Sequence, residues 1–402
     1  MPDRSFLAAL VLTLFAFPLA AQPYSVTFVI DMRQEIAAKR FDPAKDVVGV
    51  RSGVFPLSWG ETLATRDEDG DGRYEVKVSF PERPFGNQPV NYKFKVDSPG
   101  KGANDGWENG KNYRLHLDAA TQTLARRFNE PAPPIQPVLT GTQRKHPGFK
   151  SKYLGPRDVI VYLPPGYDKE ANRRYPVLYM HDGQNIFDSS NMGMEWQMDE
   201  IAERLIAAGS IEPVIIVGVG NTEARTDEYS PTAVKRWDGG AGLIGGKADL
   251  YGRLLIEELK PFIDKTYRTR PEPRSTGLGG ASLGGLVSLY LGLKHPDVFD
   301  GGLLVVSSAA SWDGQMIVKT VEALPAKTPQ RIWLDMGTRE GEEALVAVRR
   351  LHDALIAKGW KPGEDLHYLL VERGGHDETS WAARVEPMLR FLYATGQLPK
   401  RR

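Results

Sequence analysis

The segment Thr276-Gly-Leu-Gly-Gly-Ala-Ser-Leu-Gly-Gly285 is the most informative part of the sequence, because it contains the pattern G-x-S-x-G at residues 280–284. A short apolar run precedes it, and a helical pattern over residues 286–294 follows it. A serine at such a strand–turn–helix corner is exposed on a strained turn, and the helix N-terminus points at charge that develops beside it. We therefore expect Ser282 to act as a nucleophile and the amide of Leu283 to be one donor of an oxyanion hole.

Short apolar strands alternate with helical stretches from residue 138 to the end of the chain. Strands are expected at residues 158–163, 176–180, 213–219 and 331–335, and sheet-covering helices at residues 199–208 and 342–358. This alternation is typical of a doubly wound, mostly parallel α/β sheet. Together with the serine corner it predicts the α/β-hydrolase fold.

The general base should follow the serine, because the chain order in this fold is serine, acid, histidine. His376 lies in a loop between an expected strand at residues 366–371 and a helix, which is the position that a base requires. His295 and His352 are placed on or at the end of helices and His367 inside a strand, so His376 is favoured.

Two carboxylates compete for the role of the acid that orients the base. Asp335 lies within the strand at residues 331–335, whereas Glu340 comes after the turn at Gly337 and Thr338. A side chain beyond the turn can reach across to the imidazole, so Glu340 is favoured over Asp335.

The second oxyanion donor should come from the loop after an early strand. Residues 179–185 read Tyr-Met-His-Asp-Gly-Gln-Asn and follow the strand that ends at Met180. We expect the backbone amide of Gln184 to be this donor, with Gly183 as the alternative.

The region before residue 138 has a different pattern. Alternating segments at residues 24–31, 74–80, 90–96 and 113–117 predict an all-β sandwich over residues 22–129. Residues 130–137 carry four prolines in seven positions and predict a stiff linker to a hydrolase domain at residues 138–402. A module tethered in this way should be removable with little effect on hydrolysis of a small ester.

Residues 1–21 have the pattern of a cleaved secretory signal peptide, with Arg4, an apolar run and a final Ala20-Ala21. We therefore expect a secreted or periplasmic bacterial protein with no membrane span after cleavage.

The composition excludes several classes of partner and site. Lys and Arg (51) balance Asp and Glu (51), which argues against nucleic acid as a partner. The chain has no cysteine, so thiolate catalysis and Cys-ligated zinc are excluded, and no metal site is expected. The acidic run at residues 67–72 is interpreted as a hairpin turn.

Residues 151–392 resemble the esterase D-like family of α/β hydrolases, which includes feruloyl esterases, enterochelin esterase-type enzymes and mycolyltransferases. The resemblance rests on five motifs, which are Val161-Tyr-Leu-Pro-Pro-Gly-Tyr167, Tyr175-Pro-Val-Leu-Tyr-Met-His-Asp-Gly-Gln-Asn185, Gly280-Ala-Ser-Leu-Gly284, Gly337-Thr-Arg-Glu340 and Gly374-Gly-His-Asp-Glu-Thr-Ser-Trp381. It implies hydrolase activity without a cofactor and supports Glu340 as the acid.

Two further family-like segments, at residues 195–199 and 225–231, suggest substrate contacts. Trp196 would contact an acyl group, and Arg225 a carboxylate or a sugar. The alternatives are a packed tryptophan and an Arg225–Glu228 ion pair.

The N-terminal module is similar to the starch-binding, family 20 carbohydrate-binding modules. The similarity is clearest in Tyr92-Lys-Phe94 and in Trp107-Glu-Asn-Gly-Lys-Asn-Tyr-Arg114. In that family aromatic rings stack on sugars while polar groups read the hydroxyls. The corresponding positions are Trp59, Lys93, Trp107, Glu108 and Asn112, with core or rim packing as the alternative.

The sequence as a whole predicts a serine esterase that works through an acyl-enzyme. Its expected partner is a carboxylic ester, including carbohydrate-linked or plant-derived esters, with a glucan or other polysaccharide bound by the module. An acyltransferase of the same fold and a non-catalytic carbohydrate-binding protein with a degenerate hydrolase domain are the alternatives.

Overall fold

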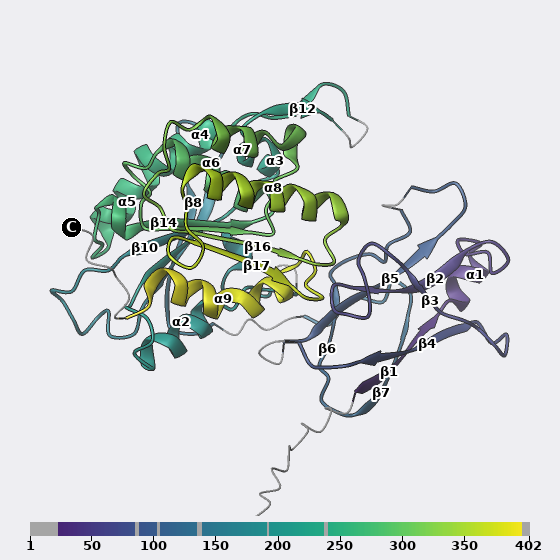
Figure 1. The fold of residues 1–402 in the computed structure, drawn as a ribbon. Coiled ribbons are helices and arrows are strands. Elements are labelled where there is room, and N and C mark those ends of the chain that lie inside the picture. Colours follow the sequence, from purple (N-terminus) through teal and green to yellow (C-terminus); the bar gives the residue numbers. More distant parts are fainter. Residues whose placement is uncertain are drawn as a thin grey trace, which may run out of the picture.

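The computed structural model describes residues 23–84, 88–102, 105–134, 139–190, 193–236 and 240–395. Figure 1 shows a smaller β-rich part, formed by the first third of the chain, beside a larger α/β part. The expected signal peptide at residues 1–21 lies outside the described residues, as do residues 135–137 of the expected linker.

The smaller part contains two sheets that share one hydrophobic core. In the first, β1 (Tyr24–Asp31) lies between antiparallel β4 (Arg73–Phe80) and parallel β7 (Thr121–Arg127). The second has the order β3 (Leu63–Ala64), β2 (Val47–Ser52), β5 (Val90–Asp97) and β6 (Tyr113–Leu115). Alternate residues of β1, Val26, Phe28 and Ile30, point into the core, as the two-residue period of a half-buried strand requires. One short helix, α1 (Arg33–Ala37), follows β1.

The larger part is built on an eight-stranded sheet. Its strands, in spatial order, are β17 (Leu366–Val371), β16 (Ile332–Gly337), β15 (Leu303–Val306), β14 (Thr276–Ala281), β10 (Val177–His181), β11 (Ile215–Val219), β9 (Arg157–Leu163) and β8 (Thr142–Phe149). The six strands from β17 to β11 are parallel, and β9 is antiparallel to both of its neighbours. The mixed, mostly parallel sheet is that of an α/β-hydrolase fold, as the sequence predicted. The polar edge strand β8 was not predicted, because an edge strand needs no continuous apolar run.

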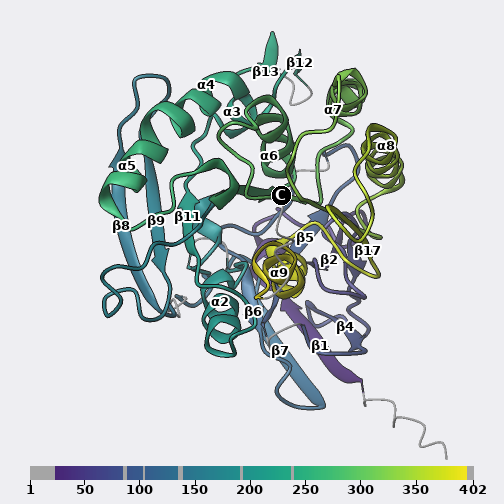
Figure 2. The ribbon, with the colours of Figure 1, turned by 60° about the vertical axis from the view of Figure 1, so that its left-hand side comes forward.

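Helices cover both faces of this sheet (Figure 2). The helices α2 (Met198–Ala207) and α9 (Glu378–Tyr393) lie on one face. The other face carries α3 (Arg225–Tyr229), α4 (Ala248–Arg253), η3 (Leu254–Leu259), α5 (Lys260–Thr266), α6 (Leu283–Lys294), α7 (Trp312–Ala323) and α8 (Glu342–Lys358). The short helices η2 (Gly183–Asn185) and η4 (Pro273–Ser275) and the hairpin of β12 (Ala233–Lys235) and β13 (Leu243–Gly245) lie in the connections.

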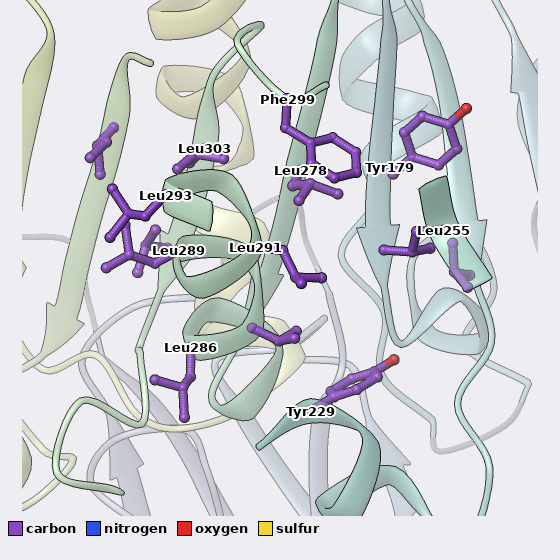
Figure 3. Packing of buried hydrophobic residues seen from close by; sticks show 14 of the residues in the cluster. Tyr179, Tyr229, Leu255, Leu278, Leu286, Leu289, Leu291, Leu293, Phe299 and Leu303 are labelled. Atoms are coloured by element: carbon purple, nitrogen blue, oxygen red, sulfur yellow. The ribbon is translucent and has the colours of Figure 1, made fainter. Parts of the chain in front are cut away.

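Successive residues of a strand point alternately into the hydrophobic cores on the two faces of the sheet. Leu303 and Val305 of β15 belong to the core beneath α6, whereas Leu304 and Val306 belong to the core beneath α2 and α9. Figure 3 shows the first of these cores, with leucines of α6 packed over the sheet. Because parallel strands buried on both faces end at the same edge, every loop after β10, β14, β15, β16 and β17 meets at one rim of the sheet. Within the described residues, no helix is long and apolar enough to cross a membrane.

Candidate active site

Ser282 stands at the corner where β14 ends and α6 begins. Its backbone has φ 60° and ψ −125°, which a residue with a side chain rarely adopts. The turn is held because the amide of Ser282 donates to the Val306 carbonyl at 3.0 Å and its own carbonyl accepts from the Ala309 amide at 3.1 Å. A Cβ on Gly280 would lie 3.0 Å from the carbonyl carbon of Gly284, so the glycines allow the strand and helix to approach closely.

His376 and Glu340 meet at the same rim of the sheet. The Nδ1 atom of His376 lies 2.7 Å from Oε2 of Glu340, from loops that follow β17 and β16 respectively. The Glu340 side chain is only 2% exposed, while that of His376 is 48% exposed. The other carboxylate oxygen, Oε1, accepts hydrogen bonds from Ser307 Oγ at 2.6 Å and from the Gly337 amide at 2.7 Å. The acid is therefore fixed by three partners, and the imidazole extends from it toward solvent.

Asp335, the alternative acid, occupies a separate buried network. Its carboxylate accepts from Arg384 Nη1 at 2.7 Å, from Trp333 Nε1 at 2.6 Å and from the Ser307 amide at 3.1 Å. Burial raises the pKa of the Asp335 carboxyl, and the charge of Arg384 opposes this shift. These contacts place Asp335 beneath the loop that carries Ser307, where it supports the rim.

Ser307 connects the acid to the layer below, and sequence reasoning did not identify it. Its φ of 42° places it in the left-handed region at the end of β15. The hydroxyl donates to Glu340 and accepts from Trp381 Nε1 at 2.9 Å. The Trp381 ring in turn lies edge-to-face against His376, with the ring centres 5.2 Å apart. A lone serine after a strand has no distinguishing pattern, so only the fold reveals this link.

The loop expected to supply the second oxyanion donor adjoins the serine corner. A Cβ on Gly284, at the start of α6, would lie 3.4 Å from both Asp182 Oδ2 and His181 Cβ. Gln184 lies in the short helix η2, and Leu283 is the first residue of α6. The first amides of a helix have no partner within the helix, so both amides are available as donors at this rim.

The residues around that loop are held by buried polar contacts. His181 is buried against Tyr251, whose hydroxyl lies 2.8 Å from its Nδ1, and burial lowers the pKa of His181 to about 4. Arg225 forms a two-point ion pair with Asp182, at 2.7 and 2.9 Å. Glu228 pairs with Arg157 at 3.0 Å. The structure therefore has the ion pairs Arg225–Asp182 and Arg157–Glu228 in place of the Arg225–Glu228 pair that the sequence suggested. Arg225 therefore fixes the loop before Gln184.

Trp196 is 2% exposed, and its ring centre lies 5.5 Å from that of Trp381. This agrees with the packed alternative and leaves no open ring face for an acyl group. The neighbouring Glu195 is also buried, and burial raises its pKa to about 8. Glu378, which accepts from Asn185 Nδ2 at 2.9 Å, has its pKa raised by burial to about 7.

The carbohydrate-binding candidates of the N-terminal part are only partly brought together. Trp59 and Trp107 are adjacent, with ring centres 6.2 Å apart and planes inclined at 55°. Lys93 Nζ donates to the Gly110 carbonyl at 2.5 Å. Glu108 is buried and accepts from the Phe94 and Asn129 amides and from Arg126, which favours a structural role.

Asn112 lines a cavity of about 430 Å³ beside the start of the linker. The cavity wall also includes Tyr113, Arg114 and Pro131.

The acidic turn at residues 67–72 gathers three carboxylates. Asp67, Asp69 and Asp71 bring carboxylate oxygens within 4.8 Å of one another. The oxygens of Asp67 accept backbone amides of the turn, as a hairpin turn before β4 requires.

The mostly parallel sheet, the serine corner and the carboxylate–imidazole pair at one rim define an α/β hydrolase of the esterase class. The chain belongs to the family described as "Putative esterase", whose model matches residues 151–392, more than half of the sequence. The family and the relatives that are named as esterases support ester hydrolysis as the class of activity.

Two relatives match the hydrolase region in sequence. The uncharacterized protein YbbA of Bacillus subtilis is 26% identical over 251 residues, which cover 60% of this chain and 95% of YbbA. The endo-1,4-beta-xylanase/feruloyl esterase of Xylanibacter ruminicola is 26% identical over 236 residues, which cover 58% of this chain and 29% of that protein. The chain thus spans less than a third of that second relative.

A solved structure extends the likeness in fold beyond the family region. The enterobactin esterase of Shigella flexneri has a TM-score of 0.58 and 17% identity, and the match covers 88% of this chain and 89% of that one. A match of this coverage must include much of the region before residue 151. At this identity the likeness concerns the fold alone.

Proposed function

We propose that this chain is a serine esterase that hydrolyses carboxylic esters through an acyl-enzyme on Ser282. The observation that carries the proposal is the 2.7 Å contact between His376 and the buried Glu340 at the rim where Ser282 sits on its strained corner. A buried carboxylate that fixes one imidazole nitrogen leaves the other as a general base.

The proposed reaction has two halves. In the first, Ser282 Oγ attacks the ester carbonyl carbon while His376 Nε2 takes the hydroxyl proton. The oxyanion of the tetrahedral intermediate accepts hydrogen bonds from the amides of Leu283 and Gln184, and the alcohol then leaves with the proton from His376. In the second, water attacks the acyl-enzyme carbonyl carbon while His376 Nε2 takes its proton, and the acid is released as His376 returns that proton to Ser282 Oγ.

The proposal is tested with purified Ser282→Ala and His376→Ala on a panel of p-nitrophenyl, feruloyl and sugar esters. Each variant should lose nearly all turnover, because nucleophile and base act as a unit. Wild-type turnover in either folded variant would refute the mechanism. The same panel identifies which esters are hydrolysed. We expect carbohydrate-linked and plant-derived esters, because one relative is named as a feruloyl esterase.

Acyl transfer is the alternative that shares this intermediate. A sugar hydroxyl would replace water in the second half, with the same residues in the same roles. Supplying an excess of a sugar acceptor and measuring acylated sugar against free acid separates the two reactions.

We further infer that residues 22–129 form a β-sandwich module that binds glucan beside a hydrolase domain at residues 138–402, and that the protein is exported after cleavage near Ala21. The Trp59–Trp107 pair is the feature that supports binding. Trp107 also has Arg51 over its ring at 5.2 Å, so Trp107→Ala should lower thermal stability, whereas Trp59→Ala should lower retention on starch alone. Failure of the intact protein to be retained on any glucan would remove the binding role.

A further inference from the structure

A loop of the N-terminal module, residues 53–60, touches the loop that carries the proposed acid. Arg339, the residue before Glu340, donates through Nη2 to the Leu57 carbonyl. The guanidinium of Arg339 also lies over the Phe55 ring, 5.5 Å from its centre. The module therefore contacts the acid loop through one hydrogen bond and one cation–π contact.

The same module loop touches the loop that carries the proposed base. Arg373 lies over Phe55 at 5.0 Å, so the ring is shared by two guanidinium groups. The backbone of Gly53 packs against Asp377, the residue after His376, so closely that a Cβ on Gly53 would lie 1.6 Å from Asp377 Oδ2. That oxygen is buried and has no hydrogen-bond partner among the described residues.

The acid and base loops are also bonded to each other. The Arg339 amide donates to the Gly374 carbonyl at 3.0 Å, and the Arg373 amide donates to Thr338 Oγ1 at 2.9 Å. Arg373 itself has a φ of 58°, which its neighbours must hold. Both loops thus form one unit, and the module covers it at three points.

We propose that residues 53–57 of this loop are a positioning element of the active site, in which Phe55 and Gly53 hold the Glu340 and His376 loops in register. This rests on the proposed function for its catalytic consequence. A carboxylate–imidazole pair works only within a narrow geometry, and a displacement of about 1 Å can lower turnover by roughly a hundredfold. Positioning should therefore affect turnover more than the affinity for a small ester.

The experiment uses the full chain with p-nitrophenyl acetate and with hydrogen exchange of residues 372–377. Phe55→Ala should lower kcat about tenfold with KM changed less than about twofold, and it should speed exchange of the base loop. Gly53→Ala should do the same, because its new methyl group displaces Asp377. Phe55→Tyr keeps the ring between the two arginines and should restore kcat.

Matched controls come from the same module. Leu63 is 40% exposed and Phe55 is 38% exposed, so Leu63→Ala removes a similar amount of exposed apolar surface away from the two loops. A Cβ on Gly60 would meet only Ser58 Oγ, at 3.6 Å, so Gly60→Ala is the control for Gly53→Ala. Both controls should keep wild-type kcat and exchange.

The two proposals fail in different ways. Wild-type kcat and exchange in both Phe55→Ala and Gly53→Ala would overturn the positioning role while leaving the esterase intact. Ester hydrolysis that is unchanged by Ser282→Ala would overturn the proposed function, and the exchange measurement would still decide whether the module holds the base loop.

Discussion

Replacing each of the two candidate acids should have a different effect: Asp335→Asn should lower stability, and Glu340→Gln should lower turnover. In Asp335→Asn the amide cannot balance Arg384, whose side chain is 2% exposed and 2.7 Å from the carboxylate. Removing one partner of a buried ion pair costs about 3–5 kcal/mol of unfolding free energy, which lowers Tm by roughly 6–20 °C in a domain of this size. In Glu340→Gln the amide can still accept from Ser307 and Gly337, so Tm should change little.

Turnover should follow the opposite order. Glu340→Gln removes the acceptor that fixes the His376 tautomer and should lower kcat roughly ten-thousandfold. Asp335→Asn should keep most turnover at a temperature well below its lowered Tm. Asp353→Asn is the matched control, because this side chain is 77% exposed and both measurements should stay at wild-type values.

The measurements are thermal unfolding by circular dichroism and kcat on a p-nitrophenyl ester at 20 °C or below. The reasoning would be refuted if Asp335→Asn kept the wild-type Tm and lost turnover as strongly as Glu340→Gln. That result would assign the acid to Asp335 and make its contact with Arg384 dispensable.

Two further outcomes are expected. Gly183→Ala should lower kcat roughly a hundredfold by shifting the Gln184 amide, because the new Cβ would lie 2.3 Å from the Gly218 carbonyl carbon. Gly155→Ala is the control and should keep the wild-type kcat, because nothing lies within 4 Å of the added Cβ. Burial raises the pKa of Glu195 to about 8, so the folded state binds a proton that the unfolded state has lost, and stability falls as pH rises from about 5 to about 8. Glu195→Gln should therefore raise Tm more at pH 9 than at pH 5, and an equal gain at both values would contradict the shift.

The local pattern of the sequence carried much of the fold. The glycines around Ser282, the turn before Glu340 and the loop of His376 are all short-range features, and each lies at the rim where parallel strands end. The edge strands β7 and β8 and the short β3 escaped prediction, because partly exposed strands do not need a continuous apolar pattern.

Features that depend on long-range contacts could not be predicted in this way. Glu108 was expected to bind a sugar. In the structure it is buried and accepts a hydrogen bond from Arg126, which lies 18 positions further along the chain. The proline-rich segment suggested a free tether, whereas Phe55 contacts Arg339 and Arg373 far along the chain. Periodicity and motifs describe neighbours in sequence, so pairings of this kind appear only once the chain is folded.

The bonds between the loops after β16 and β17 limit how such a chain can diverge. An insertion in either loop would move its partner as well, because the Arg339 amide donates to the Gly374 carbonyl and a Cβ on Gly337 would lie 2.3 Å from that same oxygen. Among the described contacts, the strands β12 and β13 have no hydrogen bond to either loop. Changes of length during evolution, and libraries made to alter the accepted ester, are therefore best placed there.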